Sequence, residues 1–159
     1  MIQTSELQLT SEDHDNAFNE VCFLLDMFVD TIEKFVGKST PSLAVAAGRK
    51  MAANMPVFID EDTVDKALSE LVRIFTVQQM EISGEMQGNE AVISINHCPI
   101  GSVCQKRGMD LDGSTCQMFH YYIAGIMAEF TGRPARPKTL SAGESCSFKL
   151  AFAGAPKRA

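Results

Sequence analysis

Hydrophobic positions at helical spacing dominate the first part of the chain and predict a helix from Ser11 to about Gly37. The polar stretch Ser11 to Asp15 offers N-cap residues and acidic charge for the first helical turn. The apolar positions of this helix are Phe18, Val21, Cys22, Leu24, Leu25, Phe28, Val29, Ile32, Phe35 and Val36. They cover more than one face, so the helix must be covered on two sides. We therefore expect a homodimer that forms through the N-terminal helices.

Two shorter helices are predicted next. Thr40 as N-cap and Pro41 at the first helical position favour a helix that runs to about Asn54 and ends before Pro56. For the third helix we expect Asp60 to Asp62 to supply the cap. Its hydrophobic positions have a clear period of 3.6, at Val64, Ala67, Leu68, Leu71, Val72 and Phe75.

Alternation of apolar and polar residues replaces the helical period after residue 80. Met80, Ile82 and Gly84 alternate with polar residues, and Ala91, Ile93 and Ile95 do the same on the other side of Gln87-Gly88-Asn89. This pattern predicts a β-hairpin with its turn at residues 87–89. Pro99 should end the second strand, because proline cannot donate a backbone hydrogen bond.

The remaining segments complete an α+β pattern. Residues 99–113 are predicted as a connection with a short helix near Val103 to Arg107. Ser114 or Thr115 caps a helix to Phe130, which Thr131-Gly132 terminates. Two strands follow, at about Ala135–Leu140 and Ser145–Phe152, and Cys146, Phe148, Leu150 and Phe152 share one face. We predict an antiparallel four-stranded sheet packed against helices.

Length and composition narrow the class of protein. A chain of 159 residues predicts one domain, which we place at residues 11–153 with a flexible leader (1–10) and a flexible tail (154–159). The net charge of -6 argues against nucleic acid as a partner. No apolar run is long enough for a membrane span, and the acidic N-terminus is unlike a signal peptide. We therefore expect a cytoplasmic protein with reduced cysteines.

The run from about Val64 to Phe152 resembles the 4-vinyl reductase-like domain family. The resemblance rests on the order of an amphipathic helix, a hairpin, the Cys116-led helix ending at Thr131-Gly132, and the close Gly143-Glu144-Ser145-Cys146. It implies a fold shared with transport-particle (TRAPP) subunits, often dimeric, and a pocket for a small, largely apolar molecule. It also implies that Cys116 and Cys146 match the first and last ligands of a zinc site found in some sensor members. The middle pair of that site is missing, because residues 135–140 contain neither an acid nor a cysteine.

Four of the five cysteines and two of the three histidines lie between His97 and Cys146. Cys116 and His120 stand four apart on a helix, so both can reach one point. Cys98 and Cys104 bracket a short segment that could bring their sulfurs together as metal ligands or as a disulfide. We expect a metal site made of Cys98, Cys104 and Cys116 with Cys146 or His120, holding zinc or an iron–sulfur cluster.

The helix after residue 114 also carries candidate ligand contacts. We predict an apolar pocket lined by Phe119, His120, Tyr122, Ile123 and Met127. The alternative is that these residues simply fill the core.

The predicted function is binding or sensing of a small, apolar molecule at a cysteine-rich site. The alternative is a cysteine-dependent enzyme or a metalloprotein that uses Cys98, Cys104 and Cys116. In an enzyme, His120 would partner the nucleophile better than His97, because His97 and Cys98 are neighbours on a strand and point to opposite faces. Whether the protein is an enzyme stays open at this level.

Overall fold

The computed structural model describes residues 10–37, 40–59, 61 and 63–154. The elements in chain order are α1 (Ser11–Val36), α2 (Thr40–Ala53), α3 (Val64–Val77), β1 (Glu81–Gln87), β2 (Glu90–Asn96), α4 (Pro99–Arg107), α5 (Ser114–Thr131), β3 (Ala135–Ser141) and β4 (Ser145–Phe152). The predicted α+β class is confirmed. The expected leader and tail lie almost entirely outside the described residues.

The four strands form one antiparallel sheet in the order β1-β2-β4-β3. β1 and β2 are joined by the predicted tight turn, in which Gln87 pairs with Glu90 and Gly88 has a positive φ of 63°. β2 then pairs with β4, so that Ile95 lies opposite Cys146 and Ile93 opposite Phe148. This pairing brings the end of the first hairpin beside the start of the last strand.

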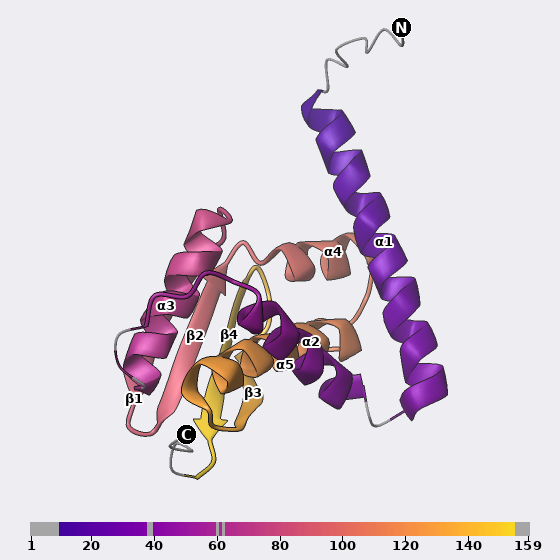
Figure 1. Cartoon of the computed structure of the whole chain (residues 1–159). Helices are drawn as coiled ribbons and strands as arrows, with labels where there is room; N and C mark the ends of the chain where they lie inside the picture. Colours follow the sequence, from indigo (N-terminus) through magenta and orange to yellow (C-terminus); the bar gives the residue numbers. More distant parts are fainter. Residues whose placement is uncertain (1–9, 38–39, 60, 62, 155–159) are drawn as a thin grey trace, which may run out of the picture.

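One face of the sheet is covered by helices, as Figure 1 shows for α3 and α5. Ile93 and Ile95 of β2 and Phe148 and Leu150 of β4 are fully buried on this face. The opposite face carries polar residues, including an ion pair of 2.7 Å between Lys149 and Glu90. Alternation with period two therefore sorts core from surface, as expected for an antiparallel sheet with one wet face.

α2 crosses α5 at very short range (Figure 1). A Cβ atom added at Gly48 of α2 would lie 2.0 Å from the carbonyl oxygen of Tyr122. One added at Gly125 of α5 would lie 2.2 Å from the carbonyl oxygen of Val45. The two backbones can approach this closely because both positions lack a side chain.

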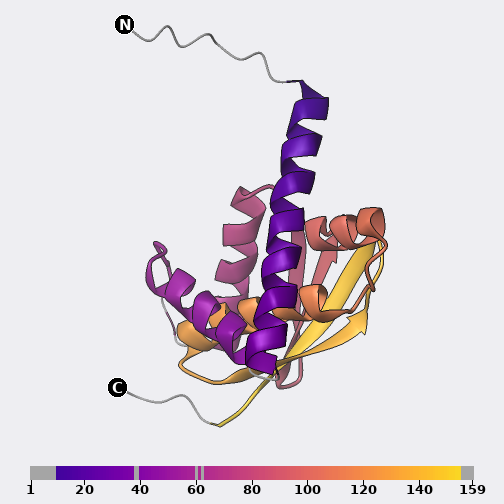
Figure 2. The same ribbon diagram turned by 90° about the vertical axis from the view of Figure 1, so that its right-hand side faces the viewer.

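α1 projects from the rest of the molecule, and Figures 1 and 2 both show its N-terminal half standing clear. Arg107 at the end of α4 contacts the helix through its side chain. Its guanidinium donates a hydrogen bond to the carbonyl oxygen of Asn19 at 3.1 Å and lies 4.5 Å from the ring centre of Phe23. Among the described residues, no helix is long and apolar enough to cross a bilayer.

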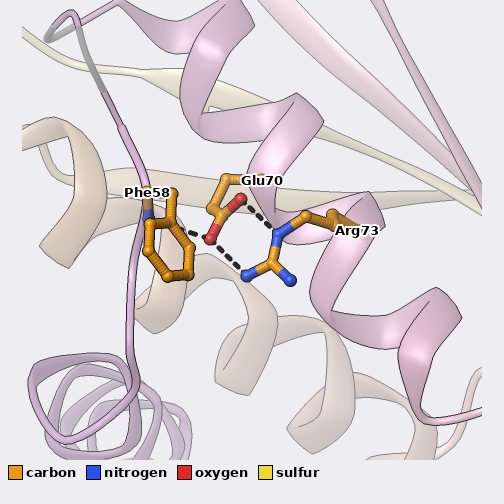
Figure 3. A network of polar contacts seen from close by, with 3 residues as sticks. All are labelled: Phe58, Glu70 and Arg73. Carbon is orange, nitrogen blue, oxygen red and sulfur yellow. Dashed lines mark hydrogen bonds and ion pairs between the residues drawn. The ribbon is translucent and has the colours of Figure 1, made fainter.

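A buried carboxylate ties the segment before α3 to that helix (Figure 3). Glu70 is only 5% exposed, and it accepts two hydrogen bonds of 2.7 Å from Arg73 and one of 3.1 Å from the backbone N–H of Phe58. The hydrogen bonds from Arg73, more than the other contacts, lower the pKa of Glu70. This network fixes the path of the chain between α2 and α3.

Several predicted helix starts are wrong in detail. α1 is capped by Thr10, whose hydroxyl and backbone N–H form reciprocal hydrogen bonds with Asp13. α3 is capped by Thr63, whose hydroxyl accepts from the N–H of Lys66 at 3.3 Å, rather than by Asp60 to Asp62, of which 60 and 62 lie outside the described residues.

The starts of α4 and α5 also differ from expectation. α4 starts at Pro99, so that the expected connection is helical from its beginning. Gly113 occupies the N-cap position of α5, in place of Ser114 or Thr115. Pro99 suits the first turn of α4, because a backbone N–H at that position would have no partner within the helix.

Candidate functional site

The cysteine-rich segment lines a small, narrow pocket between α4, α5 and the turn that joins β3 to β4. Its lining residues are Cys98, Ile100, Gly101, Leu111, Cys116, Phe119, His120, Ala142, Gly143 and Cys146. The free volume is about 10 Å³, which is room for about one water molecule. Three thiols and one imidazole thus meet in a nearly dry space.

Local structure explains how these side chains converge. Cys146 faces inward because β4 alternates with period two, and His120 lies on the buried side of α5. The imidazole of His120 stacks on the ring of Phe148 with 4.2 Å between ring centres. Cys98 stands at the N-cap of α4, directly after the turn that ends β2.

A line of polar contacts runs through His120. Its Nε2 lies 3.3 Å from Sγ of Cys146, and its Nδ1 lies 3.2 Å from Oγ1 of Thr139. The Thr139 hydroxyl in turn donates a hydrogen bond of 2.5 Å to Oδ1 of Asp112. The order thiol, imidazole, hydroxyl and carboxylate is that of a nucleophile, a base and a group that orients the base.

Burial sets the protonation of the central pair. His120 is 2% exposed, and burial lowers its pKa to about 4, against an opposing effect of the Asp112 charge. Burial also raises the pKa of Cys146 to about 12, with further contributions from Cys98, Cys116 and Asp112. At neutral pH the pair therefore consists of a neutral imidazole and a protonated thiol.

Cys98 has a different environment in the same pocket. Burial raises the pKa of its thiol, while the backbone amides of Gly101 and Ile100 at the start of α4 act in the opposite direction. The N–H groups of a helix N-terminus favour negative charge, which explains this second effect.

The structure does not arrange the predicted metal ligands as a metal site. Cys98, Cys104, Cys116 and Cys146 are buried and form no disulfide, and Cys104 and Cys116 have 3.8 Å between their sulfur atoms. Among the described residues, no group of three or more His, Cys, Asp or Glu side chains could hold a metal ion. The expected zinc or iron–sulfur centre therefore has no support from the geometry.

The predicted ligand contacts divide into two groups. Phe119 and His120 line the narrow pocket, and Tyr122 stacks on Phe119 with 6.5 Å between ring centres. Ile123 and Met127 are fully buried members of the hydrophobic core and line neither cavity beside His120. Helical periodicity could not separate these groups, because core and pocket residues occupy the same side of α5.

An open cleft of about 320 Å³ adjoins the other edge of His120. Its remaining lining residues are Asp112, Gln117, Tyr121, Pro137, Lys138 and Thr139. Sequence reasoning missed Thr139, although period two in β3 places it on the same face as Ala135 and Pro137, opposite Phe148. His97, in contrast, lies at the surface, where its ring contacts Glu81 and Glu144. It is therefore not placed to act as a base for Cys98.

Comparison with solved structures finds a similar fold in the crystal structure of the phenol-responsive sensory domain of the transcription activator PoxR with phenol. The TM-score is 0.58 at 10% sequence identity, over 84% of this chain and 73% of that chain. Identity this low establishes a shared fold alone. No curated protein matches the sequence.

The sequence model of a family described as L-2-amino-thiazoline-4-carboxylic acid hydrolase matches residues 24–150. That family has a 4-vinyl reductase-like fold, so the resemblance is confirmed at this level, while the relation to transport-particle subunits stays a prediction. The matched range extends from α1 into β4 and includes Asp112, His120, Thr139 and Cys146. By this match over most of its length, the chain belongs to the L-2-amino-thiazoline-4-carboxylic acid hydrolase family.

Proposed function

We propose that this protein is a small-molecule hydrolase in which Cys146 is the nucleophile and His120 the general base. The observation that carries this proposal is the 3.3 Å contact between Nε2 of His120 and Sγ of Cys146 in a buried pocket. An adjacent general base at this range is one of the ways in which a thiol nucleophile is activated. The family name supports hydrolysis, and the compound it contains supplies the first substrate to test.

The chemistry follows from the structure of that compound. The ring carbon of a 2-aminothiazoline is bonded to two nitrogens and one sulfur, and it is electrophilic. Sγ of Cys146 attacks this carbon while its proton passes to Nε2 of His120. A ring bond to the carbon breaks, and the leaving heteroatom takes the proton from His120. Water, deprotonated by the same imidazole, then displaces Sγ and regenerates the thiol.

Burial keeps His120 neutral, but it raises the pKa of Cys146 and lowers that of His120, so the substrate must offset the cost of moving the proton between them. A neutral imidazole can accept a proton at pH 7, whereas an imidazolium could not. The positive charge formed on His120 is stabilised through Thr139 by the carboxylate of Asp112, as in a catalytic triad.

Substrate access requires a movement. A Cβ atom added at Gly101 of α4 would lie 3.1 Å from the carbonyl oxygen of Gly143 in the β3–β4 turn. The pocket beside the thiols has a free volume of about 10 Å³, room for about one water molecule. We expect the turn and the start of α4 to separate when substrate binds.

The test is hydrolysis of L-2-amino-thiazoline-4-carboxylic acid, followed by chromatography of the products. Cys146→Ala should lower kcat/KM at least about 10³-fold, since it removes the nucleophile. Cys104→Ala, at a buried cysteine that does not line the pocket, is the matched control and should stay within about tenfold of the wild type. Activity of Cys146→Ala within tenfold of the wild type would show that Cys146 is not the nucleophile.

A second candidate function is ligand binding without turnover. The specific observation in its favour is the similar fold of a sensory domain solved with phenol. Isothermal titration with phenol and with the thiazoline acid distinguishes the two. A wild-type protein that binds either compound but forms no product would support a sensor and contradict the hydrolase.

We also propose that α1 pairs with the α1 helix of a second copy. Val21, Leu24, Phe28 and Phe35 form a row, the α1 apolar row, at heptad spacing, and each is more than half exposed. With the neighbouring Phe18 and Met27, the exposed apolar area is on the order of 650 Å². This approaches the roughly 800 Å² per partner of a standard interface.

A further inference from the structure

The hydrogen-bond chain behind His120 permits one arrangement of protons. The carboxylate of Asp112 can only accept, so the hydroxyl of Thr139 donates to it over 2.5 Å. Since that hydroxyl proton is used, Oγ1 of Thr139 must accept from His120, which therefore carries its proton on Nδ1. The lone pair of Nε2 then points to Cys146, whose S–H can donate to it.

The backbone holds Asp112 for this contact. Its φ is 73°, in the left-handed region that few residues other than glycine adopt, although aspartate tolerates it. Its carbonyl oxygen accepts a hydrogen bond of 3.0 Å from the side chain of Gln117, one turn into α5. An uncommon backbone conformation at a site residue is consistent with a position selected for its side chain.

Three separate elements meet in the chain of contacts. Asp112 precedes α5, His120 lies within it, and Thr139 comes from β3. A purely local role, such as capping α5, would not need a hydroxyl from another strand. The titratable groups around His120 are Asp112, Cys98, Cys116 and Cys146, with Tyr121 and Lys138 across the cleft. Of these, Asp112 is the group that Thr139 connects to Nδ1.

We propose that Asp112 and Thr139 are positioning residues that hold His120 as the Nδ1–H tautomer and so present an unprotonated Nε2 to Cys146. The tautomer follows from the contacts alone. Its use in proton transfer from Cys146 rests on the proposed function. A neutral imidazole in the other tautomer would offer an N–H to the thiol and could not act as its base.

The test reads the tautomer directly. Long-range ¹⁵N–¹H correlation spectra of protein labelled in histidine, recorded at pH 7, distinguish the two ring nitrogens, and a His120→Gln variant assigns the signals among the three histidines. The wild type should show the Nδ1–H form at His120. An Nε2–H form in the wild type would overturn the proposal.

Substitutions then test each link. In Asp112→Asn the amide can donate to Thr139, whose hydroxyl then donates to Nδ1, so the tautomer should invert to Nε2–H. Thr139→Val should lose the Nδ1–H preference, and Thr139→Ser should restore it. Asp110→Asn, an exposed neighbour outside the chain of contacts, is the control and should leave the spectrum unchanged. An unchanged tautomer in Asp112→Asn or Thr139→Val would remove that residue from the proposed role.

Measurements of hydrolysis distinguish the positioning role of Asp112 and Thr139 from the proposed hydrolase function. If the protein hydrolyses the thiazoline acid, Asp112→Asn should lower kcat on the order of 10²–10⁴-fold, because the wrong tautomer faces the nucleophile. If the wild type shows the expected tautomer but forms no product, the positioning role stands and the hydrolase proposal fails. Turnover by Asp112→Asn at the wild-type rate, with its tautomer inverted, would show that the tautomer does not serve catalysis.

Discussion

His120 is 2% exposed, and its ring lies between Phe148, Cys146 and Thr139. Such an environment disfavours the charged imidazolium, since burial removes the water that would solvate it. Cys146 responds to the same burial in the opposite direction, because its charged form is the deprotonated one. Burial therefore keeps both members of the candidate catalytic pair neutral until a proton moves between them.

This burial predicts a dependence of stability on pH. The pKa of His120 falls from 6.5 to about 4 on folding, so the unfolded chain takes up a proton first as the pH is lowered. The stabilisation of the folded state by neutral His120 is fully present above pH 6.5 and is lost progressively as the pH falls to about 4. The total loss of unfolding free energy is about 3 kcal/mol. Urea unfolding of the wild type and of His120→Gln across this range measures it.

His120→Gln should show a smaller loss of unfolding free energy than the wild type between pH 6.5 and 4. His97→Gln is the control, because His97 is 70% exposed, and it should follow the wild type. Equal slopes for the wild type and His120→Gln would contradict a buried, neutral His120.

At the scale of elements, the crossing of α2 and α5 positions the site. The backbone atoms of Tyr122 and Ile126 in α5 lie directly against Gly48 of α2. This close contact helps to position α5 relative to the sheet. His120 lies on the same helix, one half-turn before Tyr122. The geometry of the Cys146–His120 contact therefore depends on two glycines that never touch the pocket.

Gly48→Ala should destabilise the protein by on the order of 3 kcal/mol. Alanine stabilises a helix by about 1 kcal/mol relative to glycine. Its Cβ would collide with the backbone of α5, however, and the stability lost through such overpacking exceeds that gain. Thermal or urea unfolding measures the change. Arg49→Ala, at an exposed neighbouring position of α2, is the control and should change stability little. A stabilised Gly48→Ala protein would mean that the helices are further apart than described.

At the scale of the whole molecule, α1 is the element that the rest of the fold covers least. Its apolar row faces away from the domain, and Figures 1 and 2 show the helix extending beyond the sheet. α1 also carries seven acidic residues and one lysine. Two such helices repel each other at low salt, so that self-association must draw on apolar burial.

Light scattering after gel filtration should give about twice the monomer mass of 17.4 kDa, with a larger dimer fraction as salt screens the acidic residues. Phe28→Glu puts a charge into the apolar row and should yield a monomer. Asn16→Asp adds the same charge outside the row and should leave the dimer intact. A wild-type monomer at all salt concentrations would exclude pairing through α1.

Particular helices and strands show which parts of the fold the sequence predicts. The period of 3.6 in α3 and the period of two around Gly88 locate a helix and a hairpin close to their observed bounds, because each pattern reflects one buried face. The errors fall at helix starts such as Thr10, Thr63 and Pro99. Several residues there can serve as a cap, and the choice between them depends on where the neighbouring chain runs.

The sequence by itself determined the α+β class, the positions of the strands and the inward direction of Cys146, because these follow from local periodicity. It also placed Cys116 and His120 on one helix. Only the tertiary structure decided that His120 contacts Cys146 and Thr139, and that Ile123 and Met127 belong to the core. These contacts join residues from α5, β3 and β4, and strand pairing with helix packing sets their distances. No local pattern along the chain contains that information.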